Sequence, residues 1–169
     1  RLIAAQGLDA SVREYVGVPV TFSFGLGRIR AVATAGGASF LPARGFRVDE
    51  FAAMLERDEV NALAAVPTLL RLILAHPSRF SGIGEKLKWL EIGSQAMRAD
   101  EKQEIARIFP NARIIQHYGL TEASRTTFLN ISDEPTAHHA SVGRANGDVE
   151  IRITAQGRIA IRGPHVASG

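Results

Sequence analysis

The chain contains no cysteine, so it has neither a disulfide framework nor a thiolate metal site. No apolar run approaches the roughly 18 residues that a membrane-spanning helix needs, and no signal-peptide pattern is present. Its lysines and arginines are scattered, without a basic run or interleaved aromatic residues, which argues against nucleic-acid binding. We therefore expect neither a membrane span nor a nucleic-acid partner, and the missing cysteine fits a cytoplasmic location.

What the sequence does have is the composition of a globular domain. Of its 169 residues, 46% are hydrophobic and 22% are charged, and the net charge is +3. A chain of this length can bury a sizeable core in one domain. It begins within a pattern at Arg1 and stops at GPHVASG, which is typical of an unfinished strand and turn. This predicts a piece of a longer protein.

Segments with strand-like and helix-like patterns alternate along most of the chain. The expected strands are Val18–Phe24, Ala38–Leu41, Asn61–Val66, Leu87–Gly93 and Ile114–Tyr118. The expected helices are Arg1–Tyr15, Gly25–Gly37, Val48–Arg57, Pro67–Ala75 and Asp100–Phe109. This alternation predicts an α/β subdomain over residues 1–131, with a doubly wound, mainly parallel sheet. Residues 132–169 are expected to form a linker and a hairpin, Asp148–Thr154 with Arg158–Arg162, that begins an antiparallel β layer.

One stretch, Ile114–Ser124 (IIQHYGLTEAS), joins a buried strand to a polar turn. Ligands of open α/β sheets bind at the carboxyl ends of the strands, where this turn would lie. There it would present an aromatic ring (Tyr118), a hydroxyl (Thr121) and a carboxylate (Glu122). A ring can stack on a purine, a hydroxyl can bond a phosphate oxygen, and a carboxylate suits Mg²⁺. The stretch therefore predicts a nucleotide site, whereas an ordinary strand and turn is the simpler alternative.

Several motifs resemble one family. HYGLTE resembles the Y-G-[LM]-T-E signature of the adenylate-forming ligases, which include acyl-CoA synthetases, luciferases and nonribosomal-peptide adenylation domains. Gly93–Met97 is similar to the family's G-G-x-[AP]-L turn, and Pro19–Gly25 (PVTFSFG) to its P-x-x-[HF]-x-x-G segment. Weaker matches are Val66-Pro67-Thr68, Ser141–Arg144 and the closing GRIAIRGPHVASG. In order and spacing, the matches cover roughly Val18 to Gly169.

The resemblance implies an enzyme that joins a carboxylic acid, fatty or aryl, to ATP with the help of Mg²⁺. It then passes the acyl group to CoA or to a phosphopantetheine carrier. The implied catalytic residues are Thr121, on the α-phosphate, and Glu122, on the metal. The implied nucleotide-binding residues are Gly93, Ser94, Gln95, His117, Tyr118, Gly119 and Thr121. The implied residues around the acid are Phe22, Ser23, Phe24, Gly25, Val66 and Gly143.

The sequence departs from the family pattern at Ser23 and in the turn after Gly93, where Gln95 and Met97 are also not the commonest choices. Amino-acid-activating members commonly carry an aspartate at Ser23, and a hydroxyl is a poor buried partner for an ammonium group. Ser94 stands where the family has a second glycine. The resemblance also places the phosphate loop before Arg1, and the ribose-binding aspartate and catalytic lysine after Gly169. We therefore expect this chain to be inactive alone.

A different class of protein shares the predicted sheet. A flavodoxin-like binding or regulatory module without catalysis has the same alternation of strands and helices, and fold alone does not fix function. The sequence upstream of Arg1 would separate the two hypotheses, because only a ligase needs a Ser/Thr/Gly-rich loop ending in lysine there.

Overall fold

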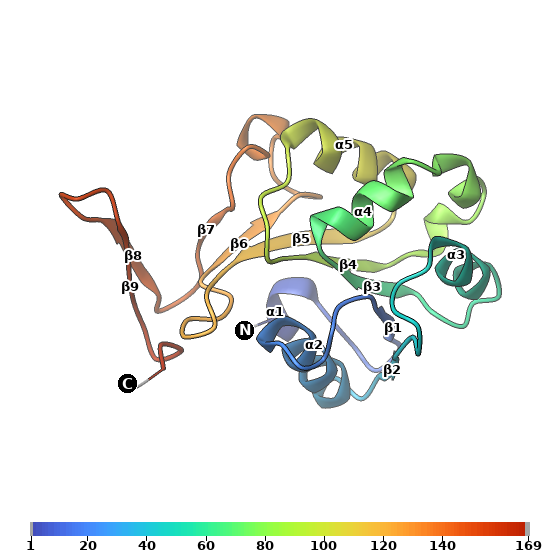
Figure 1. The fold of residues 1–169 in the computed structure, drawn as a ribbon, viewed down its shortest axis with the longest axis horizontal. Coiled ribbons are helices and arrows are strands. Elements are labelled where there is room, and N and C mark those ends of the chain that lie inside the picture. The colour runs from blue at the N-terminus through green and yellow to red at the C-terminus, as the bar shows by residue number, and fades with distance from the viewer. Residues whose placement is uncertain (1, 168–169) are drawn as a thin grey trace.

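A seven-stranded sheet forms the body of the protein, in a computed structural model that describes residues 2–167 (Figure 1). Its strands are β1 (Arg13–Val16), β2 (Ala38–Phe40), β3 (Ala62–Ala65), β4 (Trp89–Ile92), β5 (Arg113–Tyr118), β6 (Thr127–Asn130) and β7 (Arg144–Ala145). They lie in the order β2-β1-β3-β4-β5-β6-β7. The first five strands are mutually parallel, and β6 and β7 are each antiparallel to the strand before. The predicted mainly parallel sheet is confirmed.

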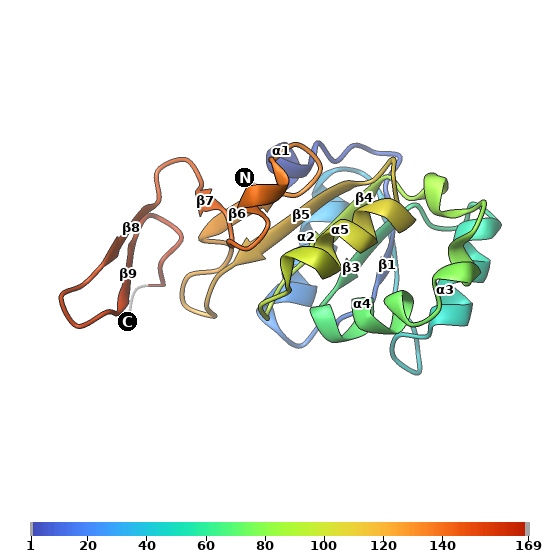
Figure 2. The ribbon, with the colours of Figure 1, turned by 90° about the horizontal axis from the view of Figure 1, so that it is seen from above.

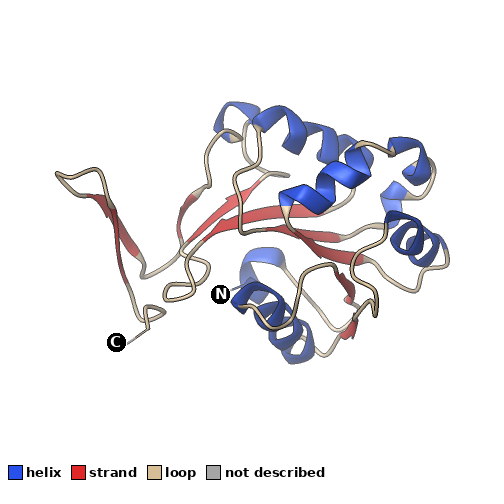
Figure 3. Ribbon diagram, viewed as in Figure 1, coloured by secondary structure: helices blue, strands red, loops and turns tan. Residues whose placement is uncertain are grey.

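Helices cover both faces of this sheet. They are α1 (Leu2–Gln6), α2 (Ser23–Thr34), α3 (Val48–Glu56), α4 (Pro67–Leu74) and α5 (Ala99–Ile108). In Figure 1, α4 and α5 lie above the sheet and α1 and α2 below it, and Figure 3 shows the sheet in red between them. Short 3₁₀ turns occupy Pro77–Phe80, Gly84–Lys86 and Thr136–His138. The protein is therefore doubly wound, as the alternation predicts.

Each face of the sheet has its own core. On one face, Phe51 of α3, Leu70 of α4 and Ile105 of α5 are fully buried in one large cluster. On the other face, Val32 of α2 packs in a smaller cluster with Trp89 of β4. The strand β3 is buried along its whole length, because helices cover both faces of the sheet. It therefore consists of apolar residues without polar alternation, as is typical of parallel sheets.

The first strand differs from the sequence prediction. The segment Val18–Phe24 leaves the sheet, and β1 instead occupies Arg13–Val16, which overlaps the end of the helix expected over Arg1–Tyr15 (Arg1 itself lies outside the described residues). Pro19 cannot donate a hydrogen bond to a sheet ladder, which disfavours a strand there. The chain turns so tightly that a Cβ on Gly25 would lie 2.4 Å from the carbonyl oxygen of Pro19, so only glycine fits. The motif PVTFSFG is therefore the loop and first turn that follow β1.

The C-terminal part forms a second layer. Strands β8 (Glu150–Ile153) and β9 (Ile159–Arg162) make a separate antiparallel pair, which confirms the predicted hairpin. It projects away from the main sheet in Figure 2 and leaves Ile153 67% exposed. Because β7 pairs with β6, the main sheet continues beyond residue 131, and the division of the chain at residues 131/132 stays a prediction. Over residues 2–167, no helix is long and apolar enough to cross a membrane.

Candidate functional site

The loops that carry the predicted site residues meet at one edge of the sheet. Because β1, β3, β4 and β5 are parallel, the segments after them emerge on the same side. These segments are residues 17–25 after β1, Val66 after β3, residues 93–97 after β4 and residues 119–125 after β5. Four motifs that lie far apart in the sequence are therefore neighbours in space.

The turn after β4 is held by its neighbours. Ser94 has a backbone φ of +72°, a left-handed conformation that favours glycine, and it fills the position where the family pattern has one. The Nε2 of Gln116, on β5, donates to the carbonyl oxygen of Gln95 at 3.4 Å. The hydroxyl of Thr68, in the first turn of α4, lies 3.3 Å from Oε1 of Gln95. The exposed side chains of Ser94 and Gln95 thus project from a fixed backbone.

His117 joins this turn to the loop after β1. Its ring is buried and meets the ring of Phe24 edge to face, with centroids 4.8 Å apart. A Cβ on Gly93 would lie 2.2 Å from Cε1 of His117, so the imidazole occupies the space that a side chain at position 93 would need. Phe24 of α2, Gly93 after β4 and His117 of β5 are three predicted site residues that form one packed unit.

The loop after β5 presents the polar part of the signature. Tyr118 is half-buried at the strand end, and Thr121 and Glu122 are exposed. On one side, the chain after β9 braces this loop, because the N–H of Ala167 donates to the carbonyl oxygen of Glu122 at 2.7 Å. The turn needs Gly119, since a Cβ there would lie 2.4 Å from the backbone nitrogen of Arg125. The two residues predicted to contact phosphate and metal are therefore open to solvent on an anchored loop.

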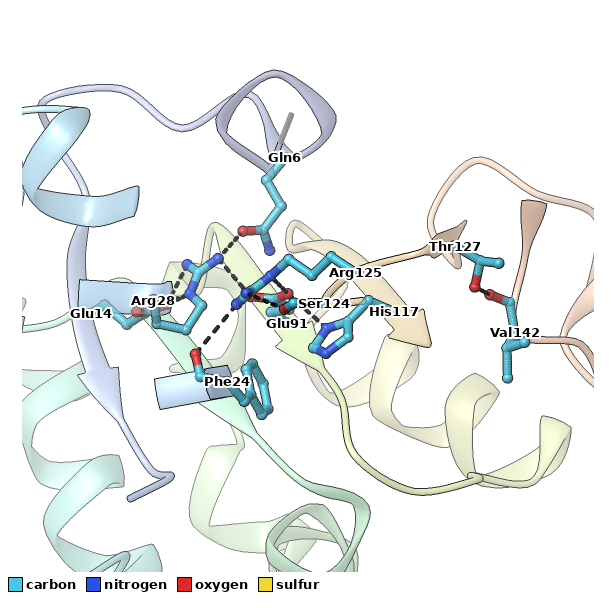
Figure 4. Close-up of polar contacts among 10 residues, drawn as sticks. All are labelled: Gln6, Glu14, Phe24, Arg28, Glu91, His117, Ser124, Arg125, Thr127 and Val142. Atoms are coloured by element: carbon cyan, nitrogen blue, oxygen red, sulfur yellow. Dashed lines mark hydrogen bonds and ion pairs between the residues drawn. The ribbon is translucent and has the colours of Figure 1, made fainter. Parts of the chain in front are cut away.

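A buried charge cluster lies beneath these loops (Figure 4). Its centre is Glu91, a fully buried carboxylate on β4. Arg28 donates from Nη1 to Oε2 of Glu91 at 2.9 Å, and Arg125 donates from Nε to Oε1 at 2.9 Å. Nδ1 of His117 lies 2.7 Å from the same Oε1. Burial alone would raise the pKa of Glu91, but Arg125, Arg28 and His117 outweigh it and hold the pKa well below its usual range.

A second carboxylate completes this charge cluster of Glu14, Arg28, Glu91, His117 and Arg125. Glu14 on β1 is fully buried and pairs with Arg28, which also donates to Oε1 of Gln6 on α1. Two carboxylates thus face two guanidinium groups, so the charges of these four groups balance. Sequence analysis missed this cluster. The only local signal is a lone glutamate within the apolar strand LKWLEIG, which needs a buried partner.

The remaining predicted residues around the acid lie at the rim of the same edge. Phe22 is 67% exposed, Ser23 is exposed at the start of α2, and Val66 is half-buried before α4. Gly143 has a φ of +84°, and a Cβ there would lie 1.9 Å from the carbonyl oxygen of Phe128, so it must be glycine.

The loop that contains Gly143 is anchored from two elements. The hydroxyl of Thr127 on β6 donates to the carbonyl oxygen of Val142 at 2.6 Å, as Figure 4 shows. Nζ of Lys102 on α5 donates to the carbonyl oxygens of His139 and Ser141, at 2.5 Å and 2.9 Å. Burial lowers the pKa of Lys102 to about 8. This loop is therefore held in place at the end of the sheet where β5 stops.

The exposed side of the site suits a phosphate and a single shared cation. Among residues 2–167 no group of three or more His, Asp or Glu side chains could hold a metal alone. Mg²⁺, however, is commonly held by one or two carboxylates together with substrate phosphates and water. One open carboxylate, Glu122, beside the hydroxyl of Thr121 meets that requirement.

Comparison with known proteins places the chain in a family. A 3-[(3aS,4S,7aS)-7a-methyl-1,5-dioxo-octahydro-1H-inden-4-yl]propanoyl:CoA ligase from Rhodococcus jostii is 28% identical over 151 residues, 89% of this chain and 29% of the relative. A malonyl-CoA ligase, solved with methylmalonyl-CoA and AMP, is 26% identical with a TM-score of 0.76 over 98% of this chain and 37% of that one. ATP-bound MatB from Rhodopseudomonas palustris has the same fold, with a TM-score of 0.82 at 22% identity over 98% of this chain and 34% of that one.

The chain spans 29% of the length of the Rhodococcus relative. The sequence model of the AMP-binding enzyme family matches residues 4–169. This range contains every predicted site residue and the whole charge cluster. The chain belongs to the AMP-binding enzyme family, whose members here include acyl-CoA ligases.

Proposed function

We propose that this chain forms the central part of the large domain of an ATP-dependent carboxylate-activating ligase. An oxygen of the acid attacks the α-phosphorus of ATP, and the bond to pyrophosphate breaks to give an acyl-adenylate. A thiol, from CoA or a phosphopantetheine carrier, then attacks the acyl carbon and AMP leaves. The observation that carries the proposal is the meeting of four motifs at the carboxyl edge of one sheet.

The nucleotide side of the site consists of the ends of β4 and β5. In the proposal, adenine lies between the ring of Tyr118 and the backbone of Gly93, Ser94 and Gln95. A flat base can approach a backbone only where side chains are small, and the fixed turn at Gly93 and Ser94 supports this arrangement. His117 stays beneath the turn and acts as its support, since its ring is buried against Phe24.

The reactive side consists of the loop after β5. Thr121 donates its hydroxyl to the α-phosphate, and Glu122 holds Mg²⁺, which when bound offsets negative charge on the phosphate oxygens. The exposure of both residues supports these roles. Glu122→Gln in the complete protein should slow acyl-adenylate formation and change its dependence on Mg²⁺ concentration. Normal pyrophosphate exchange in that variant would overturn the assignment.

The acid lies against the loop after β1, bordered by Phe22–Gly25, Val66 and Gly143. Ser23 offers a hydroxyl where an ammonium group would need a carboxylate, so we propose an acid without an α-amino group, fatty or aryl. Two relatives, the Rhodococcus ligase and the malonyl-CoA ligase, are named for forming CoA thioesters, which favours CoA as the acyl acceptor.

The decisive experiment is ATP–pyrophosphate exchange by the complete protein with a panel of carboxylic acids. The proposal also includes a cytoplasmic location, which fractionation of cells would test. The rival, a non-catalytic flavodoxin-like module, is supported by the order β2-β1-β3-β4-β5, which flavodoxin-like sheets share. Acid-dependent exchange excludes that rival, and its absence with every acid favours it. This chain alone should bind ATP weakly and release no pyrophosphate.

A further inference from the structure

The position of Glu91 is one where a charged side chain is not expected to stabilise the fold. It lies on β4 between leucine and isoleucine, and its side chain is fully buried. A buried carboxylate is costly to desolvate, and replacing buried ion pairs by apolar side chains is often neutral or stabilising. Its presence is therefore better explained by the geometry that its hydrogen bonds impose.

The partners of Glu91 come from three segments that carry predicted site residues. Arg28 belongs to α2, whose first turn contains Ser23, Phe24 and Gly25. His117 precedes Tyr118 on β5. Arg125 closes the loop that carries the catalytic candidates. One carboxylate thus contacts all three segments at 2.7–2.9 Å.

Arg125 connects the loop after β5 to the residues around it. Its Nη2 also donates to the carbonyl oxygen of Phe24 at 3.3 Å, and its backbone has a φ of +55°, strained for a side chain with a Cβ. Space for its guanidinium depends on Gly27, where a Cβ would lie 2.4 Å from Nη1. The planar fork of arginine fixes direction as well as distance.

We propose that Glu91 is a positioning residue, which through Arg125 holds the loop bearing Thr121 and Glu122 in register with the acid-binding segment after β1. The inference rests on the proposed function. Thr121 and Glu122 act on groups whose charge changes during the reaction, whereas Tyr118 lies on the strand itself. Loosening the loop should therefore lower kcat more than it raises the KM for ATP.

The test uses Arg125→Gln and Arg125→Lys in the complete protein, with Arg57→Gln as the control. Arg125 is 12% exposed and can be changed with less risk to folding than Glu91. Arg57, directly after α3, makes an exposed bidentate ion pair with Glu59 and contacts none of the charge cluster. For Arg125→Gln we expect at least a tenfold lower kcat of pyrophosphate exchange and less than a threefold change in the KM for ATP. Lysine should restore only part of the rate, because an ammonium group lacks the fork.

A second measurement separates this inference from the proposed function. Hydrogen exchange of the backbone amides at residues 120–125 should be at least tenfold faster in Arg125→Gln and unchanged in Arg57→Gln. If no carboxylic acid supports pyrophosphate exchange, the proposed function fails. The hydrogen-exchange measurement still reports whether the contact between Arg125 and Glu91 holds the loop. A kcat within twofold of the wild type, or unchanged amide exchange in Arg125→Gln, would overturn the positioning role.

Discussion

Replacing Gly93 by alanine should expose how tightly the candidate adenine turn is packed. The added Cβ would lie 2.2 Å from Cε1 and 2.6 Å from Nε2 of His117, and 3.0 Å from Cε1 of Phe24. The imidazole has little freedom to move, because its Nδ1 lies 2.7 Å from Oε1 of Glu91 and Phe24 lies against the ring. Overpacking of this kind costs about 1–3 kcal/mol of unfolding free energy. For a domain of this size, each kcal/mol lowers the melting temperature by about 2–4 °C.

A double-mutant cycle with His117→Ala isolates that contact. Chemical denaturation of the wild type, the two single variants and the double variant gives the four unfolding free energies. With the imidazole removed, the methyl group of the alanine at position 93 has space, so its cost should fall below about 0.5 kcal/mol. The reasoning fails if Gly93→Ala is as stable as the wild type, or if it costs the same in both backgrounds.

Three further predictions address the nucleotide, the acid and the anchored loop. In the complete protein, Tyr118→Ala should raise the KM for ATP by an amount equivalent to about 1–2 kcal/mol of lost stacking. Tyr118→Phe should leave the KM for ATP nearly unchanged. An equal rise in both variants would assign the effect to the hydroxyl. Because Ser23 lacks a carboxylate, pyrophosphate exchange should respond to simple fatty or aryl acids and not to free α-amino acids, and robust exchange with any amino acid would refute this. Burial lowers the folded-state pKa of Lys102 to about 8, below its ordinary value of 10.5, so between these pH values the unfolded chain binds more protons. The unfolding free energy of the wild type relative to Lys102→Met should therefore rise from pH 8 to pH 10.5, and a flat or falling difference would contradict the assignment.

The sequence alone predicts the sheet well, since its strands and helices depend on local signals. Apolar strands such as Asn61–Val66, and helix starts such as Pro67, are recognisable from a few adjacent residues. The prediction of the first strand is wrong, because the charged pair Arg13 and Glu14 gives β1 no apolar strand pattern. In the structure Glu14 is buried, and only its pairing with Arg28 makes a strand tolerable there.

The charge cluster could not be predicted for a related reason. Its members are separated by up to 111 positions, from Glu14 to Arg125, and no periodic pattern connects them. Apart from His117, each looks like an ordinary polar residue until the sheet brings the strand ends together. Patterns of adjacent residues therefore predict the candidate loop after β5, whereas the contacts that hold it required the three-dimensional structure.

The central claim is that adenine binds where β4 and β5 end. Photolabelling of the complete protein with 8-azido-ATP, followed by peptide mass spectrometry, tests it directly. The account predicts labelling at Tyr118 or within Gly93–Gln95, and excess ATP should abolish it. ATP-protected labelling elsewhere in the protein, with both of these segments unmodified, would contradict the account.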